Sequence, residues 1–343
     1  MSDEKPEFDE ALAGMPIKDL GLAIAGTALE PILVEFEAEI RRAGIHRITP
    51  RFYLSNEWGV PMDTIAIALP FYLARPDLAR LHLLQTGHVE GLEPQRMLRY
   101  LRHEMGHVMN YAYKLYLRAE WRILFGPFDA PYVDDYRARP FDRRFVRHLP
   151  GWYAQKHPDE DWAETFAVWM TPGSSWRSDY GEWPVALAKL EYCDRAVRAA
   201  ASEPPLVATV ELDEDVAEIG TTLRDFYGAA DGELRESAAE LDGLLRDVFA
   251  DLLPRQGESA SVAATLIRRL QSEISSEIFQ WTGCAPERIH ALMNRLAERA
   301  NLLGLTYGAD RELAAVVALT AMLTAFAMTR SVDDTDELGR AEA

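Results

Sequence analysis

Cysteine is scarce in this sequence. The 343 residues contain only Cys193 and Cys284, which lie far apart in the chain and form no C-x-x-C pair. A disulfide scaffold and a cysteine-rich zinc site are therefore both disfavoured. The same scarcity fits a reducing compartment, so we expect the protein to be cytoplasmic, with export by a leaderless route left open.

An excess of basic residues is also absent, because the formal net charge is −19. A surface of this sign repels nucleic acid and anionic membranes, so neither is expected as a partner. The acidic start, "MSDEKPEFDEALAG", lacks the basic and apolar regions of a signal peptide. The longest apolar run, Leu313–Met328, has 16 residues, short of the ~20 that cross a bilayer. We interpret this run as a buried core helix.

Hydrophobic periodicity predicts an α+β fold in the first part of the chain. Apolar residues recur at helical spacing in 20–44, whereas 47–55 and 64–74 are short and rich in β-forming residues. Further helices are predicted from Pro94 and from Pro158, where proline suits the first helical position. Within the second β segment, Ile65–Tyr72 is either the edge strand of a substrate cleft or an ordinary buried strand.

Composition changes at residues 201–218, which we interpret as a linker. The predicted domains are therefore 1–205, with the small sheet, and 206–330, which is helical throughout. Residues 331–343 are predicted to form an acidic, disordered tail.

The stretch "RYLRHEMGHVMNYAY", residues 99–113, carries the most informative motif. On a helix, His103 and His107 lie one turn apart on the same face and can bind one metal ion. Glu104 follows the first histidine and could act as general base on a metal-bound water, as in H-E-x-x-H hydrolases. Apolar residues surround the motif, and a histidine pair on a buried helix needs polar partners.

A catalytic zinc site usually has three protein ligands and one open position. The third histidine of the longer H-E-x-x-H-x-x-G-x-x-H pattern is absent, because positions 110 and 113 are Asn and Tyr. The downstream segment "DEDWAETF" offers Glu160 and Glu164 on one helix face, so one of these two can be the ligand while the other supports a histidine. Asp159 and Asp161 are interpreted as acids favoured at a helix start.

Together, "HEMGH" and "EDWAE" resemble the gluzincin metallopeptidases, which pair H-E-x-x-H with E-x-x-x-[D/E] on a later helix. The resemblance implies a zincin-like domain that binds one Zn²⁺ ion through His103, His107 and Glu160, with Glu164 supporting a histidine. Gly106 and the string "EDWAETF" are similar to anthrax lethal factor-type peptidases and to uncharacterised bacterial zinc metallopeptidases. The resemblance covers about residues 45–195.

Lethal factor-type peptidases also place a catalytic tyrosine seven residues before the ligand glutamate, which corresponds to Tyr153 here. We therefore expect Tyr153 to stabilise the oxyanion, with His148 and His157 as rivals for that role. The expected activity is zinc-dependent hydrolysis of a peptide bond in a protein or peptide substrate, with Glu104 as general base. The alternatives are a zinc hydrolase of non-peptide amides, and a binding or regulatory protein with a structural or relic zinc site.

Overall fold

The computed structural model describes residues 10–132, 136, 138–228 and 238–341, with side chains up to Met328. The chain divides into two compact units. The first comprises residues 1–82, 89–134 and 141–230, and the second comprises 83–88, 135–140 and 231–343.

Helices dominate the first unit, and its sheet has only two strands. Strands β1 (Arg51–Ser55) and β2 (Ala66–Pro70) pair in parallel, with Arg51 opposite Ala66. The helices and 3₁₀ turns that lie wholly or mostly in this unit are, in chain order, α1 (Glu10–Ala13), η1 (Ile17–Leu20), α2 (Leu29–Arg42), η2 (Phe71–Ala74), α3 (Pro76–Thr86), α4 (Pro94–Ala112), η3 (Leu115–Leu117), α5 (Ala119–Phe125), η4 (Pro150–Gln155), α6 (Pro158–Met170), α7 (Trp176–Asp179), α8 (Pro184–Ala200) and α9 (Leu223–Gly228). This mixture agrees with the predicted α+β class.

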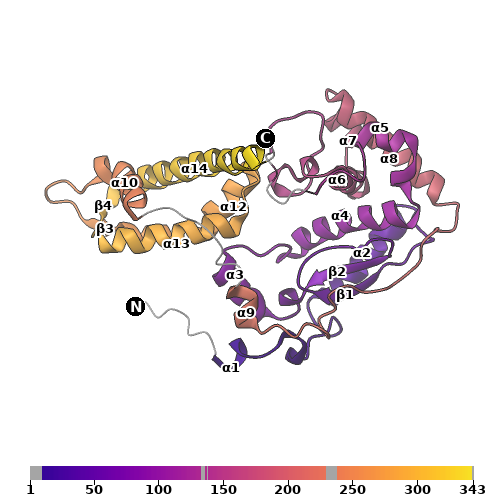
Figure 1. Ribbon diagram of the computed structural model, residues 1–343, viewed down its shortest axis with the longest axis horizontal. Coiled ribbons are helices and arrows are strands. Elements are labelled where there is room, and N and C mark those ends of the chain that lie inside the picture. Colours follow the sequence, from indigo (N-terminus) through magenta and orange to yellow (C-terminus); the bar gives the residue numbers. More distant parts are fainter. Residues whose placement is uncertain (1–9, 133–135, 137, 229–237, 342–343) are drawn as a thin grey trace. The chain divides into compact units, whose positions relative to one another are not determined.

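Helix α4 is the central element of the first unit. It packs against α6 on one side and against α2 and β2 on the other, as Figure 1 shows. Its residues are almost all buried from Met97 to Ala112, which explains why apolar side chains surround the motif. The buried Arg102 guanidinium donates two hydrogen bonds of 2.8 Å to the Glu39 carboxylate of α2. This pairing satisfies a charge that burial would otherwise make costly.

The predicted strand 64–74 contains β2, but β2 does not face the cleft as a free edge. At Ala68, β2 pairs with β1 and also forms an antiparallel bridge to Gly59, whose carbonyl accepts the Ala68 N–H at 2.8 Å. All five residues of β2 are buried. The segment Trp58–Val60 therefore covers this part of β2.

Residues 206–228 pack on the first unit. The backbone N–H of Leu206 donates to Ala112, that of Val216 donates to Leu54, and the Thr209 carbonyl accepts from Ile65, each at 2.8 Å. The unit boundary after residue 230 thus differs from the boundary expected after residue 205, because these backbone hydrogen bonds join the linker to the sheet and α4.

The second unit is a small helical body with one two-stranded antiparallel sheet, β3 (Ala260–Val262) with β4 (Thr306–Gly308). Its other elements are α10 (Ala238–Phe249), η6 (Ala250–Leu252), α11 (Ala263–Arg269), α12 (Gln271–Thr282), α13 (Pro286–Leu302), η7 (Ala309–Arg311) and α14 (Glu312–Ala341). Helix α14 includes most of the tail that we expected to be disordered. Buried side chains of α10, α11, α13 and α14 form one core.

The apolar run Leu313–Met328 forms much of α14. One stripe, which includes Leu319 and Leu323, lies in the core, whereas Leu313 and Val317 on the opposite side are 76% and 60% exposed. The run is thus a core helix on one face only.

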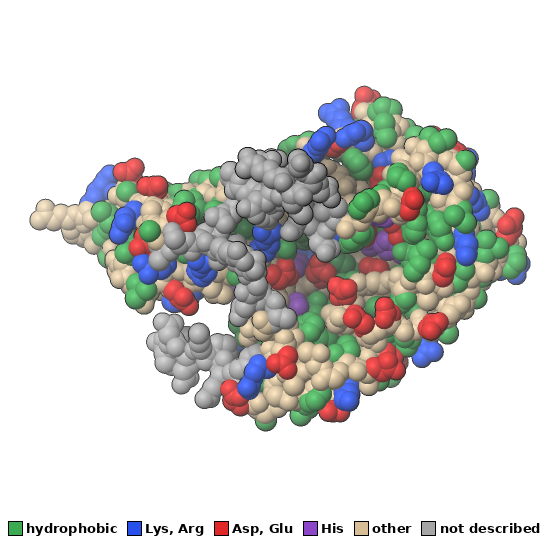
Figure 2. Space-filling view, in the orientation of Figure 1, with side chains coloured by type: hydrophobic (Ala, Val, Ile, Leu, Met, Phe, Trp, Pro, Cys, Tyr) green, Lys and Arg blue, Asp and Glu red, His purple; other side chains and the backbone are tan. Residues whose placement is uncertain are grey.

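Within the described residues, Ala309–Met328 is the one stretch long and apolar enough to cross a membrane. This is weak evidence, because core helices pass the same test. The face drawn in Figure 2 carries many acidic side chains, in keeping with the net charge of −19.

Candidate metal centre

Helix α4 directs His103 and His107 toward the same point. The helix begins at Pro94, runs to Ala112 without interruption and separates the two histidines by one turn. Their Nε2 atoms lie 3.2 Å apart. Both side chains and that of Glu104 are buried, at 2%, 7% and 5% exposure.

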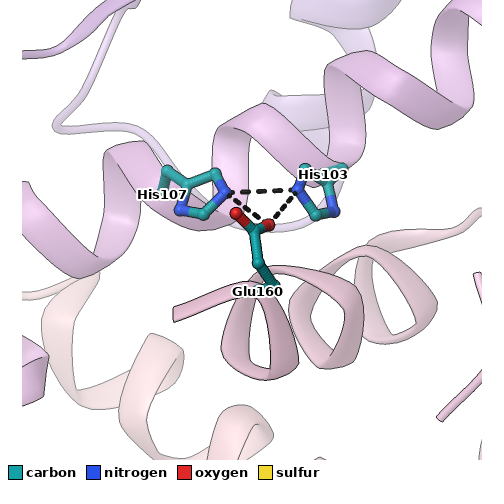
Figure 3. Close-up of side chains that lie close together, drawn as sticks. All are labelled: His103, His107 and Glu160. Atoms are coloured by element: carbon teal, nitrogen blue, oxygen red, sulfur yellow. Dashed lines mark hydrogen bonds and ion pairs between the residues drawn. The ribbon is translucent and has the colours of Figure 1, made fainter. Parts of the chain in front are cut away.

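Helix α6 brings Glu160 to the same point. Pro158 occupies the first turn, and the His157 ring accepts the Asp159 N–H at 3.2 Å, which caps the helix. In Figure 3 the Glu160 carboxylate points from α6 between the two rings. Its Oε2 atom lies 3.0 Å from Nε2 of His103 and 3.3 Å from Nε2 of His107.

The donor atoms of these three buried residues suit a metal ion. They all lie within 4.8 Å of one another and comprise two imidazole nitrogens and one carboxylate oxygen. Zinc binds such atoms at roughly 2.0–2.2 Å, and tetrahedral geometry then separates the ligand atoms by about 3.3 Å. The observed separations of 3.0, 3.2 and 3.3 Å agree with that spacing. Three protein ligands leave a fourth position for water or substrate.

Glu164 orients His103. The Nδ1–H of His103 donates to Oε1 of Glu164 at 3.0 Å. The other oxygen of Glu164 accepts the backbone N–H groups of His148 and Leu149, at 3.0 and 2.9 Å. A carboxylate held in this way fixes which nitrogen of the histidine carries the proton and leaves Nε2 for the metal.

Asp159 has the same relation to His107, which the sequence interpretation missed. The Nδ1–H of His107 donates to Oδ2 of Asp159 at 2.9 Å. Asp159 also accepts hydrogen bonds of 2.6 Å from the Asn110 amide and from the Tyr111 hydroxyl. The sequence favours an acid at a helix start for Asp159 over a role at the metal. The second histidine itself is the signal for this acid, because each metal-binding histidine usually needs a partner for its other ring nitrogen.

The close approach of α4 and α6 depends on Gly106. A Cβ at this position would lie 2.7 Å from Cα of Ala163. The Gly106 carbonyl also accepts the indole N–H of Trp162 at 2.8 Å. The small residue before His107 therefore lets the two helices touch at the level of the metal ligands.

The ionisable groups of this cluster shift one another's pKa values. Burial opposes the charged form of His103, but hydrogen bonds to Glu160 and Glu164 raise its pKa to about 9. Burial also opposes ionisation of Glu160, yet the His107 charge and the His103 hydrogen bond hold its pKa well below the usual range. Glu104 differs, because burial raises its pKa and the neighbouring histidines only partly offset this.

A cavity of about 440 Å³ opens onto the three ligand atoms. The cavity is lined by Glu104 and Tyr111 of α4 and by the segment Trp58–Val60, which covers part of β2. Among the described residues that line the cavity, none belongs to β2 itself. The cavity is thus a cleft beside the three candidate metal-binding residues.

The three residues considered as oxyanion donors differ in position. Tyr153 lines the cavity, and its ring centroid lies 5.5 Å from that of His103. His157 also lines the cavity, but its Nε2–H donates to the Ala130 carbonyl and its Nδ1 accepts from Asp159. His148 is buried and donates to the Arg99 carbonyl at 3.0 Å. Tyr153 and His157 thus both line the cavity, but the two ring nitrogens of His157 already have hydrogen-bond partners.

Asp161 lies on the side of α6 that faces α8. Its carboxylate accepts a 2.5 Å hydrogen bond from the ammonium of Lys189, and both side chains are almost fully buried. Burial raises the pKa of Asp161 to about 7 although Lys189 counteracts the effect. This ion pair joins α6 to α8.

The middle of the chain is similar to a known family. Residues 85–174 match the model described as "Putative zinc-binding metallo-peptidase". The matched segment contains α4 and α6, and hence all three metal-binding candidates. Neither a curated protein nor a solved structure matches the chain. The fold and site thus define a helix-rich α+β protein whose buried His-His-Glu cluster suits a metal ion, with a segment similar to zinc-binding metallopeptidases.

Proposed function

We propose that the protein is a zinc-dependent metallopeptidase of the gluzincin type, which hydrolyses peptide bonds in protein or peptide substrates. The observation that carries the proposal is the position of Glu160 Oε2, 3.0 and 3.3 Å from the Nε2 atoms of His103 and His107. A buried set of two histidines and one carboxylate, with a glutamate next to the first histidine, matches the requirements of a hydrolytic zinc site.

His103, His107 and Glu160 would hold one zinc ion. When bound, zinc polarises the scissile carbonyl and lowers the pKa of its water to about 7. Asp159 and Glu164 keep the two imidazole rings in the orientation that leaves both Nε2 atoms directed into the cleft.

Glu104 is the proposed general base. It lines the cavity beside the ligand histidines but does not belong to the group of donor atoms that suits the ion. The carboxylate takes a proton from the attacking water and returns it to the leaving nitrogen. Burial raises the pKa of Glu104, which strengthens it as a base relative to an exposed glutamate.

Tyr153 is the proposed donor to the carbonyl oxygen as negative charge develops there. Burial and the nearby charge of Glu160 raise the pKa of Tyr153 well above its usual value, so the hydroxyl keeps its proton. A neutral phenol can then donate a hydrogen bond throughout the reaction.

The segment Trp58–Val60 is the proposed docking edge for an extended substrate. Its opposite side is already paired with β2 through Gly59. A peptide laid along the cavity side would extend this pairing by β-augmentation.

The test compares the wild-type protein with Glu104→Gln and with the control Glu120→Gln, an exposed glutamate paired with Arg195. Zinc content is measured by metal analysis, and cleavage is measured on a proteome-derived peptide library. All three proteins should retain one equivalent of zinc, whereas Glu104→Gln alone should lose cleavage, by roughly 10²-fold or more. Undiminished cleavage by Glu104→Gln, or a wild-type protein that binds no zinc, would refute the proposal.

A further inference from the structure

Tyr132 contacts the metal-ligand candidate Glu160 from outside the two motif helices. It lies in the irregular connection between α5 and η4. Its hydroxyl donates a 2.8 Å hydrogen bond to Oε1 of Glu160. The other oxygen, Oε2, is the atom that faces the Nε2 atoms of both histidines. The two oxygens of one carboxylate thus have separate partners.

The separate partners of the two Glu160 oxygens affect how this carboxylate can bind a metal ion. A carboxylate with both oxygens free can bind a metal through one oxygen or through both. Binding through both takes up an additional coordination position, which a hydrolytic site must keep open for water and substrate. A hydroxyl that occupies Oε1 favours binding through Oε2 alone.

The Tyr132 ring is held in place although it is 51% exposed. The Lys156 ammonium lies 4.4 Å from the ring centroid, a cation–π distance. The His157 ring packs at 5.4 Å between centroids. Both neighbours adjoin the start of α6, so the ring is fixed relative to the helix that carries Glu160.

We propose that Tyr132 is a positioning residue, which holds Oε1 of Glu160 so that the carboxylate binds zinc through Oε2 alone. The inference rests on the proposed function, because it presupposes that Glu160 is a ligand. It separates the roles of two tyrosines whose hydroxyl oxygens lie 3.4 Å apart. Tyr132 acts on the ligand, whereas Tyr153 acts on the substrate.

The test measures zinc affinity by competition with a chelator, and the visible spectrum of the cobalt-substituted protein. Tyr132→Phe removes the hydroxyl and keeps the ring contacts with Lys156 and His157, so the metal-free protein should melt as the wild type does. Zinc affinity should fall roughly 10–100-fold, the usual effect of losing a partner of a metal ligand. The cobalt spectrum should shift toward that of a higher coordination number. The matched control is Tyr116→Phe, whose ring stacks on Phe128 outside the ligand cluster.

A double-mutant cycle tests whether Tyr132 acts through Glu160. In a Glu160→Ala background, Tyr132→Phe should have no further effect on the residual zinc affinity. An equal loss in both backgrounds would show that Tyr132 acts elsewhere and would overturn the inference. Unchanged affinity and an unchanged cobalt spectrum in Tyr132→Phe would also overturn it, while zinc binding by the wild type would leave the proposed function standing. A wild-type protein without zinc affinity would refute both.

Discussion

Oδ2 of Asp159 lies 2.9 Å from Nδ1 of His107, on the side of the ring away from Glu160. Five residues further along α6, Glu164 stands in the same relation to His103. Glu160 lies between these two acids in the sequence and faces both rings. A single helix thus supplies the third donor and the partners of the other two.

Asp159→Asn should weaken zinc binding by about tenfold or more, because the amide keeps the shape of the side chain but removes the charge that orients His107. Chelator competition measures this loss. Asp179→Asn, on an exposed residue of α7, is the control and should bind zinc as the wild type does. Equal affinities for the two variants would contradict a role for Asp159 at the metal centre.

Gly106→Ala should destabilise the first unit by about 1–3 kcal/mol, the usual cost of overpacking. The added Cβ would lie 2.7 Å from the backbone of α6, which cannot move aside as a flexible side chain can. Thermal melting measures the effect. The control is Gly243→Ala in α10, where nothing lies within 4 Å of an added Cβ. There, the higher helix propensity of alanine should stabilise the protein by up to ~1 kcal/mol. A Gly106→Ala protein as stable as the wild type would show that the helices can separate at no cost.

Lys189→Met should destabilise the protein by up to about 3–5 kcal/mol, because the buried Asp161 must then either stay charged without its counter-charge or take up a proton. Denaturant titration measures the loss. The double variant Lys189→Met, Asp161→Leu removes both charges and should recover most of the stability. If the double variant were less stable than the single one, the ion pair would not explain the effect.

His148 should destabilise the folded chain as the pH falls from about 6.5 to about 4, whereas Asp161, with its pKa raised to about 7, should stabilise it over the same interval. Burial lowers the pKa of this ring from 6.5 to about 4, so the folded protein keeps it neutral while the unfolded chain takes up a proton. At His148 the unfolded state therefore binds more protons in this interval, and the contribution of the ring to stability is lost as the pH falls through it. The contribution of this one group is about 3 kcal/mol.

His148→Gln isolates that contribution, since glutamine can still donate to the Arg99 carbonyl. As the pH falls from 7 to 4, the melting temperature of this variant should rise relative to that of the wild type. His46→Gln, at an exposed histidine, should follow the wild-type curve. A His148→Gln curve parallel to that of the wild type would rule out the buried ring as a cause.

Much of the candidate site could be predicted from sequence because its parts follow helical spacing. The i, i+4 relations of His103 with His107 and of Glu160 with Glu164 hold on any regular helix. Proline at the first turn located the starts of α4 and α6. Residue types then supplied the chemistry, because two histidines and a glutamate are a familiar zinc-binding set.

The site residues that could not be predicted from the sequence, Asp159 and Tyr132, are placed by contacts between separate elements of the fold. Asp159 reaches His107 only because α4 and α6 cross at Gly106 and Ala163, a contact that no periodicity encodes. Tyr132 belongs to an irregular connection, and its position against Glu160 is set by tertiary packing alone. The parallel pairing of β1 with β2, and the covering of β2 at Gly59, likewise follow from the path of the chain between strands.

The crossing of α4 and α6 also links metal binding to folding. Helix α4 carries two of the three candidate donors and α6 carries the third, so the proposed zinc site would be complete only while the two helices are docked. A ligand that binds only the folded state stabilises it in proportion to the logarithm of its concentration, by about 2.7 kcal/mol at a hundred times the dissociation constant. Zinc should therefore raise the melting temperature of the first unit, and a chelator should lower it. Variants that loosen the helix crossing should lose affinity for the metal without altering any ligand.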